Sequence, residues 1–151
     1  PRCAAMHEAS DSYPVPQTLE IDLERIRAYW DTLKRGDDAV PFWDDVRLSA
    51  LADRGASALL IDAFEDPPRF RFNTLGAQVI TRYGKTVAGK FCDEVEPRSP
   101  FDLLTAQCSA TVRRRAPTYY RHSGDHSYGR IILPLWGNGH IGMLLGGIAT
   151  G

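Results

Sequence analysis

Residues 118–148 read TYYRHSGDHSYGRIILPLWGNGHIGMLLGGI, and this stretch decides the fold. It contains three runs of strand length that are rich in aromatic and aliphatic residues: Thr118–His122, Tyr128–Trp136 and Ile141–Ile148. Ser123-Gly124-Asp125 and Gly137-Asn138-Gly139 separate these runs, and short segments of this composition form tight turns. Because tight turns join antiparallel neighbours, the stretch predicts three consecutive antiparallel strands.

Two further strands are predicted upstream. Ala58-Leu59-Leu60-Ile61 is a short apolar run, and residues 69–73 alternate polar and apolar side chains with a period of two. Glu65-Asp66-Pro67-Pro68 separates them and must form a turn, because prolines donate no hydrogen bond to a β-ladder. The pair predicts a β-hairpin with one buried face, which brings the expected sheet to five strands.

A stripe of apolar residues predicts a helix over residues 18–36, with Thr18 as its N-cap and Gly36 just past its end. The stripe recurs at steps of three and four and so occupies one helical face: Leu19, Leu23, Ile26, Trp30 and Leu33. A helix that packs on its own domain would show this pattern. A helix that pairs with its copy in a dimer would show it too, so both interpretations stay open.

Helical segments are predicted between the hairpin and the last three strands, and one more precedes the hairpin. The short ones cover about residues 44–55, 76–83 and 89–95. A longer helix is predicted to begin at Ser99, since Pro100 and Asp102 follow this hydroxyl cap, and to end at Ala116-Pro117. Its apolar residues share one face: Phe101, Leu104, Cys108 and Val112.

This order of elements predicts an α+β fold with a five-stranded antiparallel sheet. The 151 residues, with 43% hydrophobic and 25% charged side chains, fit one globular domain over 18–151. Residues 1–17 lack periodicity, contain three prolines and are expected to be a flexible leader.

Charge and cysteine content exclude several classes of protein. A net charge of −1 gives no general attraction for nucleic acid. Three cysteines with no CxxC pair indicate neither a disulfide framework nor a zinc site, which favours a reducing cytoplasm. The apolar stretch at residues 140–150 is shorter than the roughly 20 residues that a membrane span needs, and no secretory signal is visible.

Several motifs resemble those of PAS domains, in particular of stand-alone bacterial PAS-like proteins that begin with a helix bearing Tyr-Trp. The matching stretches are Tyr29-Trp30 with Leu33 and Gly36, Asp66–Phe72 (DPPRFRF), Leu75-Gly76, Gly84, Gly89, Ala116-Pro117, Leu133-Pro134-Leu135 and Met143–Gly146. The DPPRFRF segment that runs into Leu75-Gly76 is the most specific. Together the stretches span about residues 18–149, in the order that the elements of a PAS domain follow.

The resemblance implies a curved sheet with helices over one face, which enclose a cavity that holds a small molecule or is filled by side chains. Relatives of this kind serve signalling and often dimerise through the N-terminal helix. The candidates for a ligand pocket are Phe72, Tyr83, Phe91, Cys92, Phe101, Tyr119 and Trp136. The candidates for a dimer contact are the residues of the helical stripe: Leu19, Leu23, Ile26, Trp30 and Leu33.

Cofactor motifs are incomplete. Gly89-Lys90-Phe91-Cys92 resembles the cysteine motif of flavin-binding light-oxygen-voltage domains, but Asp93-Glu94-Val95 replaces the expected Arg-Phe-Leu-Gln. No paired asparagines follow in the last strands, so flavin is not expected and Cys92 is interpreted as a small apolar residue. Haem is not expected either, because the predicted helix over 100–115 contains no histidine.

Catalytic and metal motifs are also missing. His122, Asp125 and His126 fall on a predicted turn, where their spacing has no helical meaning and no third ligand is assignable. The serines near them lie in no nucleophile elbow, and no helix follows the glycine-rich turn that begins at Gly137. We therefore predict neither a metal site nor an enzyme.

The expected function is that of a cytoplasmic sensory or regulatory module. Its partners would be a small-molecule ligand, a signalling protein or a second copy of the chain as a homodimer. A ligand-free scaffold for protein interaction and dimerisation is the alternative, since fold resemblance alone establishes no ligand. A small α+β enzyme is the third hypothesis, and it would need convergent polar groups in a cleft.

Overall fold

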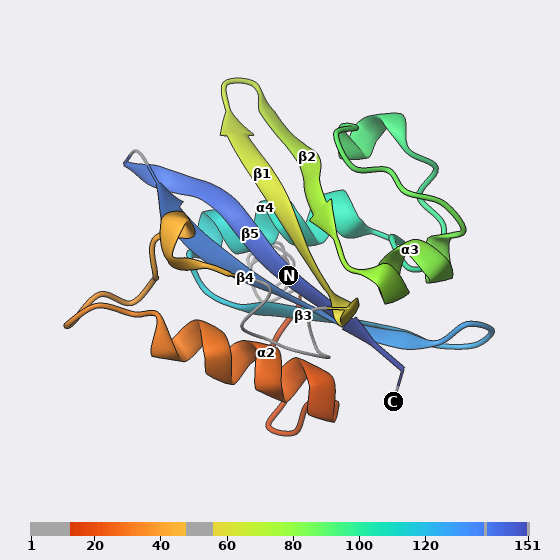
Figure 1. The fold of residues 1–151 in the computed structure, drawn as a ribbon, viewed down its shortest axis with the longest axis horizontal. Helices are drawn as coiled ribbons and strands as arrows, with labels where there is room; N and C mark the ends of the chain where they lie inside the picture. The colour runs from red at the N-terminus through yellow and green to blue at the C-terminus, as the bar shows by residue number, and fades with distance from the viewer. Residues whose placement is uncertain (1–12, 48–55, 138, 151) are drawn as a thin grey trace, which may run out of the picture.

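A computed structural model describes residues 13–47, 56–137 and 139–150. Five strands form one antiparallel sheet in the order β2-β1-β5-β4-β3 (Figure 1). The strands are β1 (Ala58–Glu65), β2 (Pro68–Leu75), β3 (Thr118–His122), β4 (Tyr128–Gly137) and β5 (His140–Ala149). The predicted α+β class, the five strands and their antiparallel pairing are confirmed.

Among the described residues, three α-helices pack against this sheet. They are α2 (Ile21–Thr32), α3 (Ala77–Tyr83) and α4 (Leu104–Arg114), and the short 3₁₀ helices η1 (Trp43–Asp45) and η3 (Cys92–Glu94) lie in the connections. Helix α2 lies on one face of the sheet, and α3 and α4 lie on the other (Figure 1). We call the α3 and α4 side the inner face and the α2 side the outer face.

Each face has its own apolar cluster. The inner cluster joins the sheet to α3 and α4 through Phe72, Val79, Tyr83, Phe101, Leu104, Cys108, Ile132 and Leu144 among others. The outer cluster joins the sheet to α2 through Leu23, Ile26, Trp30, Ile131, Leu133, Leu135 and Leu145 among others. Strand β4 supplies both clusters by alternation, with Ile131 facing outward and Ile132 inward. Burial on both faces explains why residues 131–136 of β4 form a continuous apolar run.

The apolar stripe of the N-terminal helix is buried by the chain itself. Leu23, Ile26 and Trp30 are almost completely buried in the outer cluster, and the Trp30 indole Nε1 donates a hydrogen bond of 2.9 Å to the Pro134 carbonyl. The helix is shorter than the predicted range of 18–36. Thr18 is not its cap: Glu20 occupies the N-cap position.

The predicted start of the longer helix is wrong. Helix α4 begins at Leu104 instead of Ser99, with Leu103 at its N-cap in the left-handed conformation. Tertiary contacts hold the preceding segment out of a helix, because the Phe101 ring is buried in the inner cluster and the Pro100 and Asp102 carbonyls accept hydrogen bonds from Arg130. Local cap propensity is thereby overridden.

Two other local predictions, the end of the second helix and the turn of the hairpin, are confirmed. Helix α3 ends at Gly84, whose φ of 106° is the left-handed conformation that favours glycine at a helix end. The hairpin β1–β2 turns at Asp66-Pro67, as the prolines predict. Only η1 is described within the predicted helix at about 44–55, and the rest of that prediction, residues 48–55, lies outside the described residues.

The described part of the predicted leader contacts the sheet. The Tyr119 amide donates a 3.1 Å hydrogen bond to the Tyr13 carbonyl at the β3 edge, and Val15 packs against the outer cluster. Residues 1–12 lie outside the described residues. Within the described ranges, no helix combines the length and the apolar character that crossing a membrane requires.

Candidate functional site

A pocket of about 240 Å³ opens on the inner face, between β2 and the segment that leads from η3 into α4. Its apolar wall is formed by Phe72, Cys92, Val95, Phe101, Leu103 and Leu104. Leu103 stands at the rim, since more than half of its surface is exposed, whereas Phe72, Phe101 and Leu104 belong to the buried inner cluster. The pocket therefore has an apolar base, and its rim combines Leu103 with the exposed polar residues Glu96 and Thr105.

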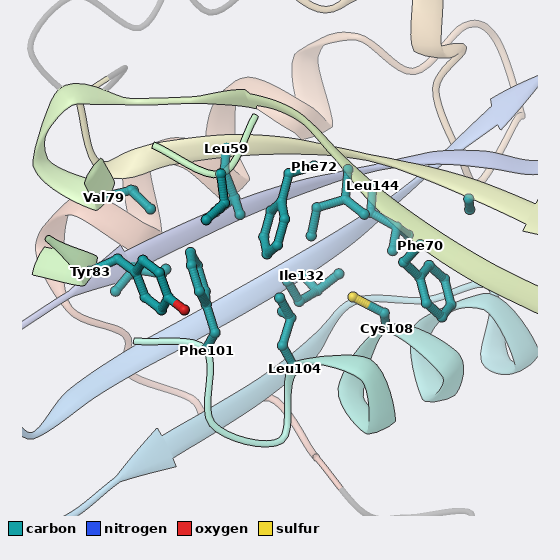
Figure 2. Packing of buried hydrophobic residues seen from close by; sticks show 14 of the residues in the cluster. Leu59, Phe70, Phe72, Val79, Tyr83, Phe101, Leu104, Cys108, Ile132 and Leu144 are labelled. Carbon is teal, nitrogen blue, oxygen red and sulfur yellow. The ribbon is translucent and has the colours of Figure 1, made fainter. Parts of the chain in front are cut away.

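Packed aromatic rings form the base of this pocket. The Phe101 ring lies between Phe72, with ring centroids 4.8 Å apart, and Tyr83, with centroids 4.9 Å apart (Figure 2). The Tyr83 hydroxyl donates a 3.0 Å hydrogen bond to the Glu96 carbonyl, which joins α3 to the segment that closes the pocket. Tilted ring pairs at this separation are favourable beyond their buried area, so the base is well held.

The predicted pocket residues divide into groups. Phe72, Cys92 and Phe101 line the inner pocket, and Tyr83 supports it from behind Phe101. Phe91 instead lies at the β2 edge, where the Arg69 guanidinium stacks 3.6 Å above its ring centroid.

Two of the candidates lie elsewhere in the structure. Trp136 lines a separate hollow with Val40, Phe42 and Arg115. Tyr119 lies on the outer face, where its hydroxyl donates a 2.9 Å hydrogen bond to Glu20, so it does not line the inner pocket. Side chains along a strand point to the two faces of the sheet in turn. Thr118 and Tyr120, on either side of Tyr119 in β3, point inward, so Tyr119 points outward.

Cys92 is a weak nucleophile in this setting. Burial raises the pKa of its thiol to about 12, and the nearby Asp93 carboxylate acts in the same direction. Burial also raises the pKa of the Cys108 thiol, which is fully enclosed in the inner cluster. Because the thiolate is the reactive form, both side chains are neutral apolar groups near pH 7.

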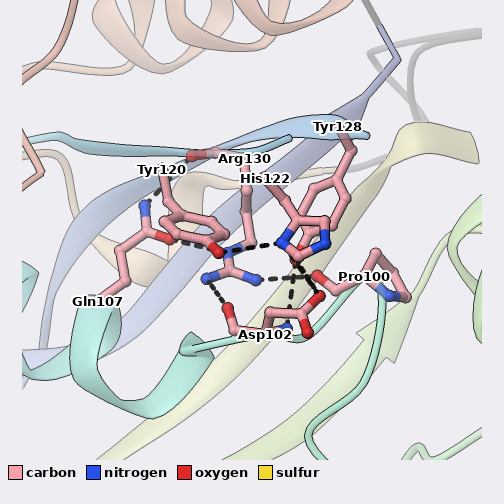
Figure 3. A network of polar contacts seen from close by, with 7 residues as sticks. All are labelled: Pro100, Asp102, Gln107, Tyr120, His122, Tyr128 and Arg130. Atoms are coloured by element: carbon pink, nitrogen blue, oxygen red, sulfur yellow. Dashed lines mark hydrogen bonds and ion pairs between the residues drawn. The ribbon is translucent and has the colours of Figure 1, made fainter. Parts of the chain in front are cut away.

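Beside the pocket lies Arg130, a completely buried cation. Its Nε donates a 2.7 Å hydrogen bond to Gln107 Oε1, Nη1 one of 2.8 Å to the Pro100 carbonyl, and Nη2 one of 2.7 Å to the Asp102 carbonyl (Figure 3). The guanidinium also lies 4.9 Å from the centroid of the Tyr120 ring. All three acceptors are neutral, and burial lowers the pKa of Arg130.

The acceptors of Arg130 are themselves held in place. Gln107 Nε2 donates to Thr118 Oγ1 at 3.1 Å and to the Arg130 carbonyl at 3.2 Å. The Tyr128 hydroxyl donates a 2.8 Å hydrogen bond to the Asp102 carboxylate and accepts one from the Asp102 amide. The network thus fixes α4 and the segment before it, which forms the pocket wall, to strands β3 and β4.

His122 lies at the end of the network that is nearer to solvent. Its Nδ1 lies 3.2 Å from the Tyr120 hydroxyl and 3.9 Å from Asp102 Oδ2, and its ring stacks on Tyr128 (Figure 3). Asp125 and His126 are the residues near His122 in sequence that could also bind a metal. In the described ranges, however, no group of three His, Cys, Asp or Glu side chains could hold a metal ion.

The Arg130 network was not predicted from the sequence. Two signals were present: Arg130 interrupts the apolar run of β4, and Gln107 shares the buried face of α4 with Leu104 and Cys108. A charged or amide side chain at a core position needs internal partners. The partners themselves, the Pro100 and Asp102 carbonyls, are far away in sequence and carry no side-chain signature.

The geometry defines an α+β domain with a small apolar pocket whose wall is fixed by a buried arginine. Comparisons of the chain with protein-family models, with curated proteins and with solved structures give no match.

Proposed function

We propose that this protein is a PAS-like sensory or regulatory module that binds a small apolar molecule in the inner pocket. The observation that carries the proposal is the apolar pocket of about 240 Å³ beneath the helical middle of the chain, on one face of a five-stranded antiparallel sheet. This is the arrangement that the DPPRFRF motif and the order of elements led us to expect.

The pocket sets the size and polarity of the ligand. Its volume of about 240 Å³ exceeds that of a cavity that holds benzene, about 150 Å³, and is below the 300 Å³ or more of a typical drug-sized site. The wall consists largely of aromatic and aliphatic side chains. An uncharged molecule of one or two rings, such as toluene or indole, matches both properties.

Thermal denaturation with added indole or toluene tests this proposal. Binding to the folded state should raise the melting midpoint as the ligand concentration rises. Ala106→Leu is the blocking variant, because Ala106 lines the pocket from the exposed side of α4. Arg113→Leu, also exposed on α4 but absent from the pocket, is the matched control. Equal shifts in both variants, or no shift in the unmodified chain, would overturn the assignment.

A ligand-free interaction scaffold is the second candidate, and the filled inner cluster favours it. Side chains of the inner cluster pack between the sheet and α3 and α4 (Figure 2). Under this proposal the module is a homodimer that meets its copy through α2. Because the stripe that includes Leu23 and Ile26 is buried, the contact would use the opposite face of the helix, where Ile21 is 70% exposed.

Sedimentation of the unmodified chain and of Ile21→Glu tests the dimer. The proposal expects a dimer for the unmodified chain and a monomer for the variant, since an exposed apolar contact would be replaced by two facing carboxylates. Glu24→Ala, on the exposed side of the same helix, should leave the mass unchanged. A monomer in the unmodified chain would refute the homodimer without affecting the ligand proposal.

A further inference from the structure

The outer face of the sheet is only partly covered by α2. The helix packs over β4 and β5, where Ile131, Leu133 and Leu145 meet its apolar stripe. Helix α2 does not extend under the turn end of the β1–β2 hairpin (Figure 1). The outward-facing side chains of Asp62 and Arg71 line a groove there instead. This groove, of about 400 Å³, lies on the opposite side of the sheet from the inner pocket.

Two aromatic side chains form walls of the groove. Trp43, from η1, and Phe64, from the end of β1, are 44% and 40% exposed, which is unusual for side chains of this size. Each is held by its surroundings. Phe64 packs against Phe91 with ring centroids 5.8 Å apart, and Trp43 lies directly on Gly137, where an added Cβ atom would overlap the indole ring.

Part of the floor of the groove is bare backbone. Gly142 lines the groove, and the three heavy atoms nearest to an added Cβ atom there are backbone atoms of Gly137, at 3.4–3.8 Å. Because glycine has no side chain, residue 142 itself leaves the groove unfilled. A larger residue at this position would take up part of the groove.

The polar side of the groove is formed by Asp62, Arg71 and Asn73. Arg71 has one N–H donor there that is free of protein acceptors in the described residues. Arg71 Nε and Nη2 donate to Asp62 Oδ2 at 3.1 and 3.0 Å, whereas Nη1 makes no hydrogen bond to any part of the chain that the structure describes. Asp62 also accepts from Asn73 Nδ2 at 3.2 Å. The charge of Arg71 is thus balanced by Asp62, and the groove presents an N–H donor without net positive charge.

We propose that this groove is a second binding site, for an uncharged planar aromatic molecule that carries a carbonyl group. The ring system would pack against Trp43 and Phe64 above the glycine floor, and the carbonyl oxygen would accept the hydrogen bond that Arg71 Nη1 has available. An anionic ligand is disfavoured because Asp62 neutralises Arg71 and the carboxylate of Glu65 is close to His140, another residue of the groove.

Titration of the ¹⁵N-labelled full chain with 2-quinolinone tests the site. The expected result is saturable shifts of the Gly137, Gly142 and Met143 amides. Quinoline, which keeps the ring system and lacks the carbonyl, should bind about tenfold more weakly because it forfeits the hydrogen bond to the guanidinium. Tighter binding of 2-naphthoate than of 2-quinolinone would overturn the assignment to an uncharged ligand.

Matched variants locate the binding. Arg71→Ala and Gly142→Val should each weaken 2-quinolinone binding by about tenfold or more, the first by removing the donor and the second by filling the floor. Arg69→Ala is the control, since Arg69 lies two residues away on the same strand, pairs with Asp93 and does not line the groove. The inner-pocket variant Ala106→Leu should also bind normally.

Absence of saturable shifts in these amides, or an equal loss in Arg69→Ala and Arg71→Ala, would refute the second site. Loss in Ala106→Leu alone would place the 2-quinolinone site in the inner pocket instead. Because the inner-pocket proposal is tested with indole and toluene, either site can fail without the other.

Discussion

The stability of the fold depends strongly on one side chain, that of Arg130. It lies completely inside the protein, and its guanidinium is stabilised by the Gln107 side chain and by the Pro100 and Asp102 carbonyls. Removal of the donors leaves these acceptors buried without partners, which costs more than the hydrogen bonds contribute. The same contacts hold the segment that forms the wall of the inner pocket.

Arg130→Met should therefore lower the free energy of unfolding by about 3 kcal/mol, because each of the three buried acceptors left without a donor costs about 1–3 kcal/mol before the structure relaxes. Urea denaturation followed by tryptophan fluorescence measures the change. Arg69→Met is the matched control from β2, where the guanidinium pairs with the exposed carboxylate of Asp93, and it should cost less than about 1 kcal/mol. A similar small loss for Arg130→Met would show that the pocket wall does not depend on the buried guanidinium.

The rate at which the Cys92 thiol is alkylated should depend strongly on pH. Burial raises its pKa to about 12, so the neutral thiol is favoured in the folded state up to high pH. Its alkylation by iodoacetamide at pH 8 should be at least about a hundredfold slower than that of a free thiol with a pKa near 8.5, and the rate should rise about tenfold per pH unit while the protein stays folded.

Mass spectrometry of tryptic peptides resolves the cysteines, and urea-unfolded protein supplies the reference rate. The sign of the linked stability follows from the raised pKa. The stabilising contribution of the protonated thiol is complete below the unfolded pKa and is lost as the pH rises toward 12. Rapid alkylation of Cys92 at pH 8 in the folded chain would contradict its burial.

Strand β5 fits closely under α2 because Gly147, which faces the helix, has no side chain. A Cβ atom on Gly147 would lie 2.7 Å from Ile26 Cδ1 and 3.0 Å from Leu23 Cδ2, whereas one on Gly146 would meet Leu59 on the inner face. The close approach of helix and sheet thus requires glycine for reasons of space. Residue size on β5 decides whether the outer cluster can form.

Gly147→Val should displace α2 and lower the free energy of unfolding by about 1–3 kcal/mol, the usual cost of overpacking. Hydrogen exchange would show faster exchange of the α2 amides, with α4 still protected. Gly142→Ala on the same strand is the control, since the nearest neighbours of its Cβ atom would be Gly137 backbone atoms at ordinary contact distances. Unchanged exchange of α2 in Gly147→Val would mean that the helix is not held by this contact.

The strands could be predicted from the sequence more accurately than the start of helix α4. The strands were predictable because alternation, apolar runs and tight turns are local signals, and β4 and β5 follow them closely. The start of α4 was not, because Ser99 and Pro100 form a good local cap that Arg130 and the buried Phe101 ring override. Long-range contacts of this kind leave no periodic trace near the residues that they affect.

The candidate site was predictable only in part for the same reason. Phe72, Cys92 and Phe101 were identified because a motif and a resemblance pointed to the inner face. Tyr119 was misplaced, since the phase of a short strand such as β3 cannot be fixed from five residues alone. The groove on the outer face left no signal, because the side chains that line it come from η1, β1, β2 and β5.

The sheet has an apolar cluster on each face, so its stability requires both faces to be buried. Deletion of residues 1–36 would expose Ile131, Leu133, Leu135 and Leu145 to water, while the inner cluster would remain complete. Apolar burial contributes roughly 1.5–3 kcal/mol for each such side chain, which together is comparable to the whole stability of a small domain. The domain is therefore expected to need α2 as a structural element, whatever else the helix contacts.

The fragment 37–151 should consequently show no cooperative thermal unfolding by circular dichroism and should bind the dye ANS. A synthetic peptide of residues 13–36 should restore the cooperative transition, because it supplies the stripe of Leu23, Ile26 and Trp30 in trans. A Trp30→Ala peptide is the control and should fail, since it lacks both the packing and the hydrogen bond to Pro134. Cooperative unfolding of the fragment alone would show that the inner cluster suffices and that α2 is free to serve another contact.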